Sequence, residues 1–235
     1  MEILLAHAKE TLALHPDSSS GHGKLGELQM RHGDFTDASA ELAKAVRLAP
    51  RDPVWTLELA CLYLFIGDHG GYRASCRRLL DSQVNLSDPI RAADAAQICL
   101  ISAPAASDLP RITELAGRVA GTTPERIFDE GLIELRRGNS AAAQPLFQRM
   151  LSTDPQVSDK VAANLYLALC LAQEGDDSRS LIALEAAEAD FAQLPKISDG
   201  DLTADFINVL ICHIARREAR AALGLPVQPA TQPAR

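Results

Sequence analysis

The chain has 235 residues, a formal net charge of −8 and a sequence pI near 5.2. An acidic balance of this size argues against non-specific binding to nucleic acid or to an anionic membrane. Hydrophobic residues make up 47% of the chain and aromatic residues only 4%, a composition that suits closely packed helices better than sheets. No apolar run approaches the ~18 residues of a membrane-spanning helix, so we expect an all-α protein that does not cross a membrane.

Residues 1–16 predict one helix, from Leu4 to Leu14, which Pro16 closes because proline cannot continue a helix. We interpret this segment as the second half of a helical hairpin whose first half is missing. Two explanations stay open: the segment is an N-terminal cap, or the chain is the tail of a larger protein. The short N-terminus of mixed charge is a poor match to a signal peptide.

The next stretch, from His22 to Pro50, predicts two short helices joined by a tight turn. Gly33 followed by Asp34 ends the first helix, since glycine tolerates the left-handed conformation at a helix end. The second helix carries an apolar stripe with helical spacing, and Pro50 prevents its continuation. The stripe consists of Ala38, Leu42, Ala45 and Val46.

Four marks of this hairpin recur together further along the chain. Gly26, Gly33, Ala38 and Pro50 have counterparts, all at one common offset, in Gly131, Gly138, Ala143 and Pro155. This punctuation resembles the tetratricopeptide repeat, a helix-turn-helix unit of 34 residues, although His22 replaces the large aromatic residue that usually opens the motif. The resemblance implies a right-handed α-α superhelix, and we expect Gly26 and Gly131 to mark close approaches between helices.

The resemblance implies about five helix-turn-helix units and a C-terminal capping helix. Within residues 17–195 we expect the units at 19–52, 53–86, 88–121, 124–157 and 161–194. In the fourth unit, Pro145 is expected to bend the second helix or to delay its start. The capping helix is expected over 199–223, with polar side chains such as Arg216 and Arg220 in water, and residues 224–235 are expected to be a disordered tail.

The stretch from Leu62 to Leu80, LYLFIGDHGGYRASCRRLL, carries a more specific resemblance. Together with an Ala-Pro turn in the third unit and the terminal ARREARAAL, it is similar to the tetratricopeptide tails of multidomain Ser/Thr kinase-like signalling proteins of planctomycete-type bacteria. The chain has no Gly-rich loop, H-R-D or D-F-G motif of a kinase. The resemblance therefore implies a bacterial, non-catalytic interaction region, for which a detached kinase-like tail is one origin.

The sequence contains no familiar motif of a catalytic or metal site. The patterns H-E-x-x-H, G-x-S-x-G and G-x-x-x-x-G-K-[ST] are all missing. Its five cysteines form no C-x-x-C pair, so we interpret them as small hydrophobic residues buried in a reducing, cytoplasmic compartment. They are Cys61, Cys76, Cys99, Cys170 and Cys212. We therefore expect that the chain is not an enzyme and needs neither a cofactor nor a metal.

In this repeat family the first helices of the units line a concave groove. By analogy, the resemblance places seven residues there: Glu27, Met30, Arg31, Phe65, Phe128, Leu132 and Arg136. Arg31 and Arg136 occupy corresponding helix ends, so we expect the groove to hold an extended peptide that carries carboxylates. The Lys and Asn set of the carboxylate-clamp subtype is not found where it is expected, at Gly23, Glu27 and Glu58.

We therefore predict a monomeric, non-catalytic scaffold whose partner is a protein or a peptide, without direct contact to nucleic acid or membrane. A second hypothesis is a regulatory module of a bacterial signalling or transcriptional complex that acts on nucleic acid through a partner. A continuous basic stripe on the surface would favour this second hypothesis. The third hypothesis is an enzyme, which a sealed polar pocket would favour.

Overall fold

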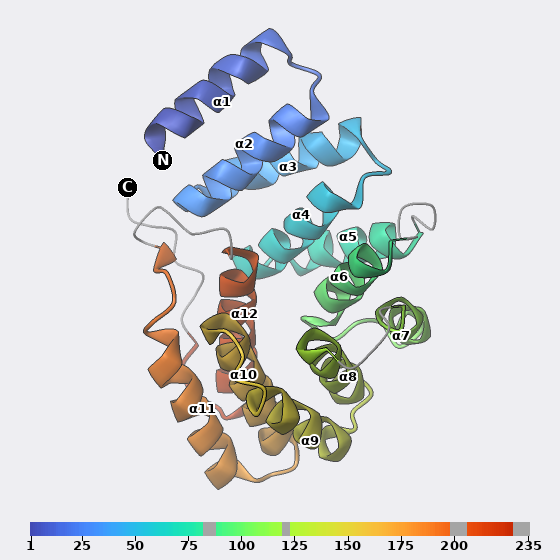
Figure 1. The fold of residues 1–235 in the computed structure, drawn as a ribbon, viewed down its shortest axis with the longest axis vertical. Helices are drawn as coiled ribbons and strands as arrows, with labels where there is room; N and C mark the ends of the chain where they lie inside the picture. The colour runs from blue at the N-terminus through green and yellow to red at the C-terminus, as the bar shows by residue number, and fades with distance from the viewer. Residues whose placement is uncertain (82–87, 119–122, 198–205, 228–235) are drawn as a thin grey trace. The chain divides into compact units, whose positions relative to one another are not determined.

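The computed structural model describes residues 1–81, 88–118, 123–197 and 206–227, and all regular secondary structure in these ranges is helical (Figure 1). The helices form two compact units. The first unit comprises the described residues among 1–87 and 195–207, and the second those among 88–194 and 208–229. The expected start of the capping helix before residue 206 and the expected tail after residue 227 lie outside the described ranges.

The first unit contains five helices in chain order. They are α1 (Glu2–Leu14), α2 (Ser19–His32), α3 (Phe35–Leu48), α4 (Pro53–Ile66) and α5 (His69–Asp81). Helix α2 packs on α3 and α4 packs on α5, so each pair is a hairpin, and α1 contacts α2. The Asp52 side chain accepts a hydrogen bond from the Val54 N–H, which caps α4 at the proline that begins it.

The second unit contains three further helical pairs and most of a final helix. The pairs are α6 (Pro89–Leu100) with α7 (Leu109–Ala116), α8 (Pro124–Arg136) with α9 (Ser140–Leu151), and α10 (Val157–Gln173) with α11 (Asp177–Phe191); the final helix is α12 (Phe206–Ala222). None of the described helices in either unit combines the length and the hydrophobicity that a membrane crossing requires.

Two helices of the second unit begin earlier than the sequence predicted. Helix α9 begins at Ser140 and continues through Pro145, so the expected delay of its start is wrong. Pro145 cannot donate a backbone hydrogen bond to the preceding turn, yet α9 continues through it and buries Ala143 and Phe147. Helix α10 begins at Val157, ahead of the expected boundary at residue 161, because no helix-breaking residue follows Pro155 in this stretch.

The turns within four of the five described hairpins share one geometry, the exception being the turn between α6 and α7. Their glycines have φ between +77° and +91°: Gly33, Gly67, Gly138 and Gly175. The next residue donates its N–H to a carbonyl in the last turn of the preceding helix, as from Asp34 to Gln29 at 2.8 Å and from Asp68 to Tyr63 at 2.7 Å. This arrangement is a Schellman motif, in which a side chain at the left-handed position is strained.

Paired helices approach each other closely at the two glycines that the sequence singled out. A Cβ atom on Gly26 would lie 2.8 Å from Cγ of Leu42, and one on Gly131 would lie 2.8 Å from Cε1 of Phe147. Leu42 and Phe147 are fully buried, so the expected close approaches are confirmed. The other hairpins carry a small first residue and a larger second one at the same spacing: Ala60 and Cys76, Ala96 and Ile112, Ala168 and Leu184.

His22, which stands where the repeat usually has an aromatic residue, is buried. Its Nε2 lies 2.8 Å from the carbonyl oxygen of Pro16, and its Nδ1 lies 2.5 Å from Oε2 of Glu41 on α3. The imidazole therefore fills the aromatic position and also ties the loop after α1 to the first hairpin.

Helix α12 is joined to the second unit by polar contacts as well as by burial. Arg216 and Arg220 form ion pairs with Glu188 on α11 at 2.5 and 3.1 Å. These arginines, which were expected to face water, are partly exposed, with 24% and 26% of their side-chain surface accessible. The buried residues of α12 lie on more than one of its faces: Phe206, Val209, Leu210, Ile211, Cys212, Ile214, Ala215 and Ala219. Its role as a cap stays a prediction.

Candidate binding site

Most of the seven residues predicted to line a groove are buried. Four of them belong to the core, with at most 5% of their surface exposed: Met30, Phe65, Phe128 and Leu132. Phe65 packs on Phe35 with 4.9 Å between the ring centroids, and Phe128 packs on Phe147 at 5.7 Å. The expectation that these four residues face a peptide is corrected by their burial, because their surfaces are already covered by neighbouring side chains.

Arg136 also has a structural place. Its side chain is 3% exposed. The guanidinium donates to the carbonyl oxygens of Leu100 and Ile101 at the end of α6, and to both carboxylate oxygens of Glu218 on α12 at 2.6 and 2.9 Å. These hydrogen bonds satisfy carbonyl groups that a helix end leaves open and join three helices. The expected role of Arg136 in holding a peptide carboxylate is therefore corrected.

The two remaining predicted residues, Glu27 and Arg31, lie on α2 and are partly exposed. Glu27 accepts a hydrogen bond from Lys24 at 2.5 Å. Burial, and secondly the charge of Glu27, raise the pKa of Glu58 on α4 to about 8. The Oε2 atom of Glu58 has no hydrogen-bond partner among the described residues. For Glu27 and Arg31 the groove assignment stays a prediction.

Glu58 belongs to a repeated position that the sequence reasoning missed. In three hairpins the first helix carries a carboxylate two residues before the small residue that approaches the second helix. These carboxylates are Glu58, Asp94 and Asp129. The pKa of each carboxyl is raised, in each case chiefly by burial. The recurrence of acidic residues at one register position was the available signal.

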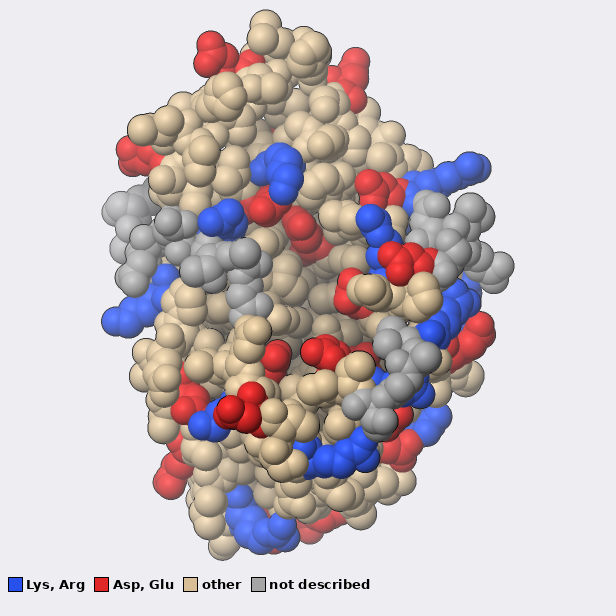
Figure 2. Space-filling view, viewed as in Figure 1, with Lys and Arg blue, Asp and Glu red and all other residues tan. Residues whose placement is uncertain are grey.

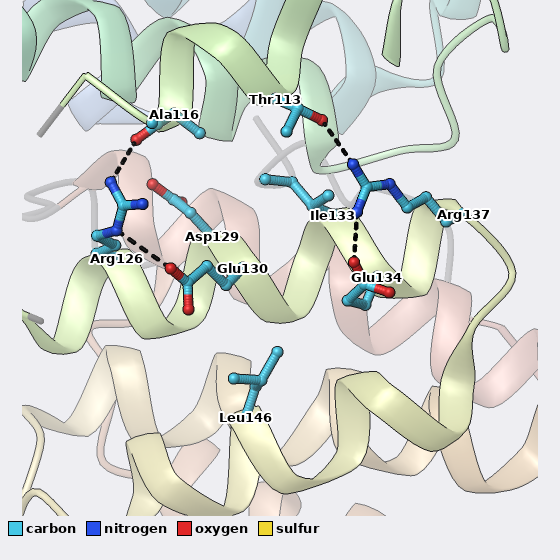
Figure 3. A pocket seen from close by; sticks show the side chains of 10 residues that line it. Thr113, Ala116, Arg126, Asp129, Glu130, Ile133, Glu134, Arg137 and Leu146 are labelled. Carbon is cyan, nitrogen blue, oxygen red and sulfur yellow. Dashed lines mark hydrogen bonds and ion pairs between the residues drawn. The ribbon is translucent and has the colours of Figure 1, made fainter. Parts of the chain in front are cut away.

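Asp129 lines a pocket of about 300 Å³ within the second unit, where α7, α8 and α9 meet (Figure 3). Ala116 from α7, Ile133 from α8 and Leu146 from α9 contribute apolar side chains to the wall. Asp129 and Ile133 lie between the two ends of the pocket. The pocket therefore combines an apolar wall with one buried acid.

An arginine–glutamate pair stands at each end of this pocket (Figure 3). Arg126 donates to Glu130 at 3.1 Å and to the Ala116 carbonyl at 3.4 Å. At the other end, Arg137 donates to Glu134 at 2.5 Å and to the Thr113 hydroxyl at 3.5 Å. Because each guanidinium already faces a carboxylate, the two pairs add little net charge.

The carboxyl group of Asp129 has an unusual environment. The residue is 5% exposed, and its Oδ1 has no hydrogen-bond partner in the described part of the chain. Burial, and secondly the negative charge of Asp94, raise the pKa of Asp129 to about 8, against the opposing effect of Arg126. Buried polar atoms in folded proteins are nearly always hydrogen-bonded, so this oxygen is an exception among the described residues.

Residues 5–53 and 128–195 match the family model of the tetratricopeptide repeat. No curated protein matches the chain in sequence. Among solved structures, a tetratricopeptide repeat protein from Parabacteroides merdae ATCC 43184 has a TM-score of 0.55 and 13% identity, with 88% of this chain and 89% of that chain covered. The predicted fold class, an all-α superhelix of sequential helix pairs, is therefore confirmed.

Two other solved structures are less similar. MamA has a TM-score of 0.44 at 13% identity and covers 74% of this chain and 92% of its own. Yeast Tom70 has a TM-score of 0.41 at 18% identity, over 93% of this chain and 42% of its own. Scores of this size carry no argument about function, and none of the matches supports an origin in a kinase-like protein.

Proposed function

We propose that this chain, a tetratricopeptide repeat protein, is a non-catalytic scaffold that binds a protein partner. The partner contacts the first helices of the helical hairpins. The observation that carries the proposal is the recurrence of carboxylates at one position of these helices: Glu58, which is half-buried, Asp94, which is exposed, and Asp129, which is buried. Two of them, Glu58 and Asp129, keep an oxygen without a hydrogen-bond partner among the described residues. A carboxylate oxygen of this kind accepts hydrogen bonds from donors such as those that a protein partner carries.

The surface charge supports a protein as the direct partner. Figure 2 shows Lys and Arg side chains interspersed with Asp and Glu, and the described residues of this face form no continuous basic stripe. The net charge of −8 points the same way, since binding to nucleic acid depends on the release of counterions by Lys and Arg. A regulatory role in a bacterial signalling or transcriptional complex, including that of a detached kinase-like tail, is the second candidate, supported only by the stretch from Leu62 to Leu80.

A charge reversal on a first helix tests the binding face. A partner captured with the full chain would be titrated against wild type, Glu27→Lys on α2 and Asp37→Lys on α3. Both changes convert a carboxylate into an ammonium, but Asp37 is exposed on a second helix. We expect Glu27→Lys to weaken binding tenfold or more, equivalent to roughly 1.4 kcal/mol, and Asp37→Lys to leave it unchanged.

The opposite result has a definite meaning. If Asp37→Lys weakens binding and Glu27→Lys does not, the partner binds the second helices. Equal affinity of both variants and wild type would exclude both of these positions from the interface. Circular dichroism of each variant, compared with wild type, shows that the helices are retained.

A further inference from the structure

We propose that the pocket between α7, α8 and α9 binds an alkylammonium group, with the Asp129 carboxylate as its counter-ion. The assignment of this group to a lysine side chain of the partner rests on the proposed scaffold function. The chemistry of the pocket does not depend on it. The observation behind the proposal is Asp129, which lines the pocket and whose buried Oδ1 has no hydrogen-bond partner among the described residues.

The charges around Asp129 favour a cation. Asp94 on α6, and Glu125 and Glu130 on α8, all act on this carboxyl with negative charge, whereas Arg126 is the opposing cation. Arg126 hydrogen-bonds Glu130. The pocket residues that α7 and α9 supply are uncharged: Thr113, Ala116, Gly117 and Leu146. A cation in the pocket would therefore meet an excess of negative charge.

The shape and the acceptor set favour an ammonium on an aliphatic stem. Ile133 and Leu146 offer apolar surface, which suits the methylene groups of a lysine, since lysine buries its stem and keeps its charge at a polar group. A volume of about 300 Å³ is at the small end of ligand pockets. A guanidinium prefers two parallel acceptors, whereas the buried Oδ1 of Asp129, which has no partner among the described residues, suits a compact point donor.

The raised pKa of Asp129 couples binding to a proton. With a pKa of about 8, the carboxyl is mostly protonated at pH 7 when the pocket holds no cation. An entering ammonium favours the ionised carboxylate and displaces that proton. Affinity should therefore rise as the pH increases toward about 8, and it should fall near pH 10, where an alkylamine itself loses its proton.

Carboxyl-detected NMR of the full chain tests the proposal directly. The probes are Nα-acetyl-lysine amide, which has an aliphatic stem and a free side-chain ammonium, and Nα-acetyl-norleucine amide, which has the aliphatic stem alone. We expect the lysine probe to shift the Asp129 carboxyl signal and to bind at least tenfold more tightly than the norleucine probe. Asp129→Asn should remove this difference, whereas Asp177→Asn, an exposed acid of the same unit, should keep it.

Equal binding of the two probes to the wild type would overturn the proposal without the use of any variant. Retention of the lysine preference in Asp129→Asn would equally overturn the role of this carboxylate. A linear polyamine that binds more tightly than a lysine-containing peptide would assign the pocket to free amines. If a captured partner binds wild type and Asp129→Asn alike, the lysine assignment fails while the scaffold function survives; if no partner is captured, the probes still test the pocket.

Discussion

Arg136 on α8 and Glu218 on α12 form a bidentate ion pair, with N–O distances of 2.6 and 2.9 Å. The Arg136 side chain is 3% exposed. The two residues lie 82 positions apart in the chain. The same guanidinium hydrogen-bonds the carbonyls that end α6. One side chain thus links the first, middle and last parts of the second unit.

We expect Arg136→Met to destabilise the protein strongly. The change removes the hydrogen bonds to Leu100 and Ile101 and leaves the Glu218 carboxylate without its cation. Breaking a buried pair from one side costs on the order of 3 kcal/mol, a value at the lower end here because Glu218 is 31% exposed. Urea denaturation followed by circular dichroism measures the effect. Arg137→Met is the matched control, since Arg137 is 45% exposed and should cost less than about 1 kcal/mol; equal losses in both variants would refute the assigned role.

We expect overpacking at the contact between α8 and α9 to lower the stability of the protein. Gly131→Leu would place a side chain where a Cβ atom alone already lies 2.8 Å from the Phe147 ring. Overpacking of this kind costs on the order of 1–3 kcal/mol. Gly70→Leu on α5 is the control, because its Cβ would meet nothing closer than 3.4 Å. The denaturant midpoint should fall for Gly131→Leu and not for Gly70→Leu. An unchanged midpoint for Gly131→Leu would mean that α8 and α9 accommodate the leucine without loss of stability.

The Asp129 carboxyl predicts a dependence of stability on pH. An acid whose pKa is raised in the folded state, here to about 8, binds more protons folded than unfolded, so its contribution to stability is present below about pH 4 and is lost as the pH rises through about 8. Asp129→Asn removes this loss. We expect the variant to match wild type near pH 3 and to exceed it near pH 9 by more than about 1 kcal/mol, since one pKa unit corresponds to about 1.4 kcal/mol.

Asp177→Asn controls for the loss of one negative charge in that experiment. Because Asp177 is exposed, the difference between this variant and wild type should not change with pH. If Asp129→Asn shows the same flat difference, the Asp129 carboxyl is ionised in the folded protein and already has a donor.

His213 on α12 should behave in the opposite way. Burial, followed by the charges of Arg216 and Arg217, lowers its pKa to about 4, and its ring packs edge-on against Phe191 at 4.8 Å. A histidine with a lowered pKa contributes stability that is present above about pH 6.5 and is lost as the pH falls through about 4. NMR titration of the ring protons should show no protonation of His213 above about pH 5, and a midpoint near 6.5 would contradict its burial.

Local chemistry explains which parts of the fold could be predicted from the sequence. Gly33 and Gly138 end their helices through a backbone conformation that a few neighbouring residues determine. The close contact of Gly131 with Phe147 likewise lies within one hairpin. Such features repeat in the sequence because each hairpin needs them independently of the rest of the chain.

The candidate site was less predictable than the fold, because it depends on contacts between residues that are far apart in the sequence. Arg136 at the end of a first helix looks the same in sequence whether it faces a ligand or Glu218, and only the position of α12 decides between them. Phe128 was equally ambiguous, since a buried aromatic and a ligand anchor follow the same helical spacing. The carboxylate of Asp129 was visible at its repeated position, but its burial depends on the packing of α7 on α8.

The pairing of a small residue with a bulky one inside each hairpin bears on how such a chain can evolve. Gly26 meets Leu42, and Gly131 meets Phe147, across a turn and not across a junction between hairpins. A duplication or deletion of one whole hairpin would therefore leave every remaining pair in register, whereas a shift of a few residues inside a hairpin would separate the partners. Length variation among descendants of this chain should then occur in steps of complete hairpins, with smaller insertions confined to the loops that join them.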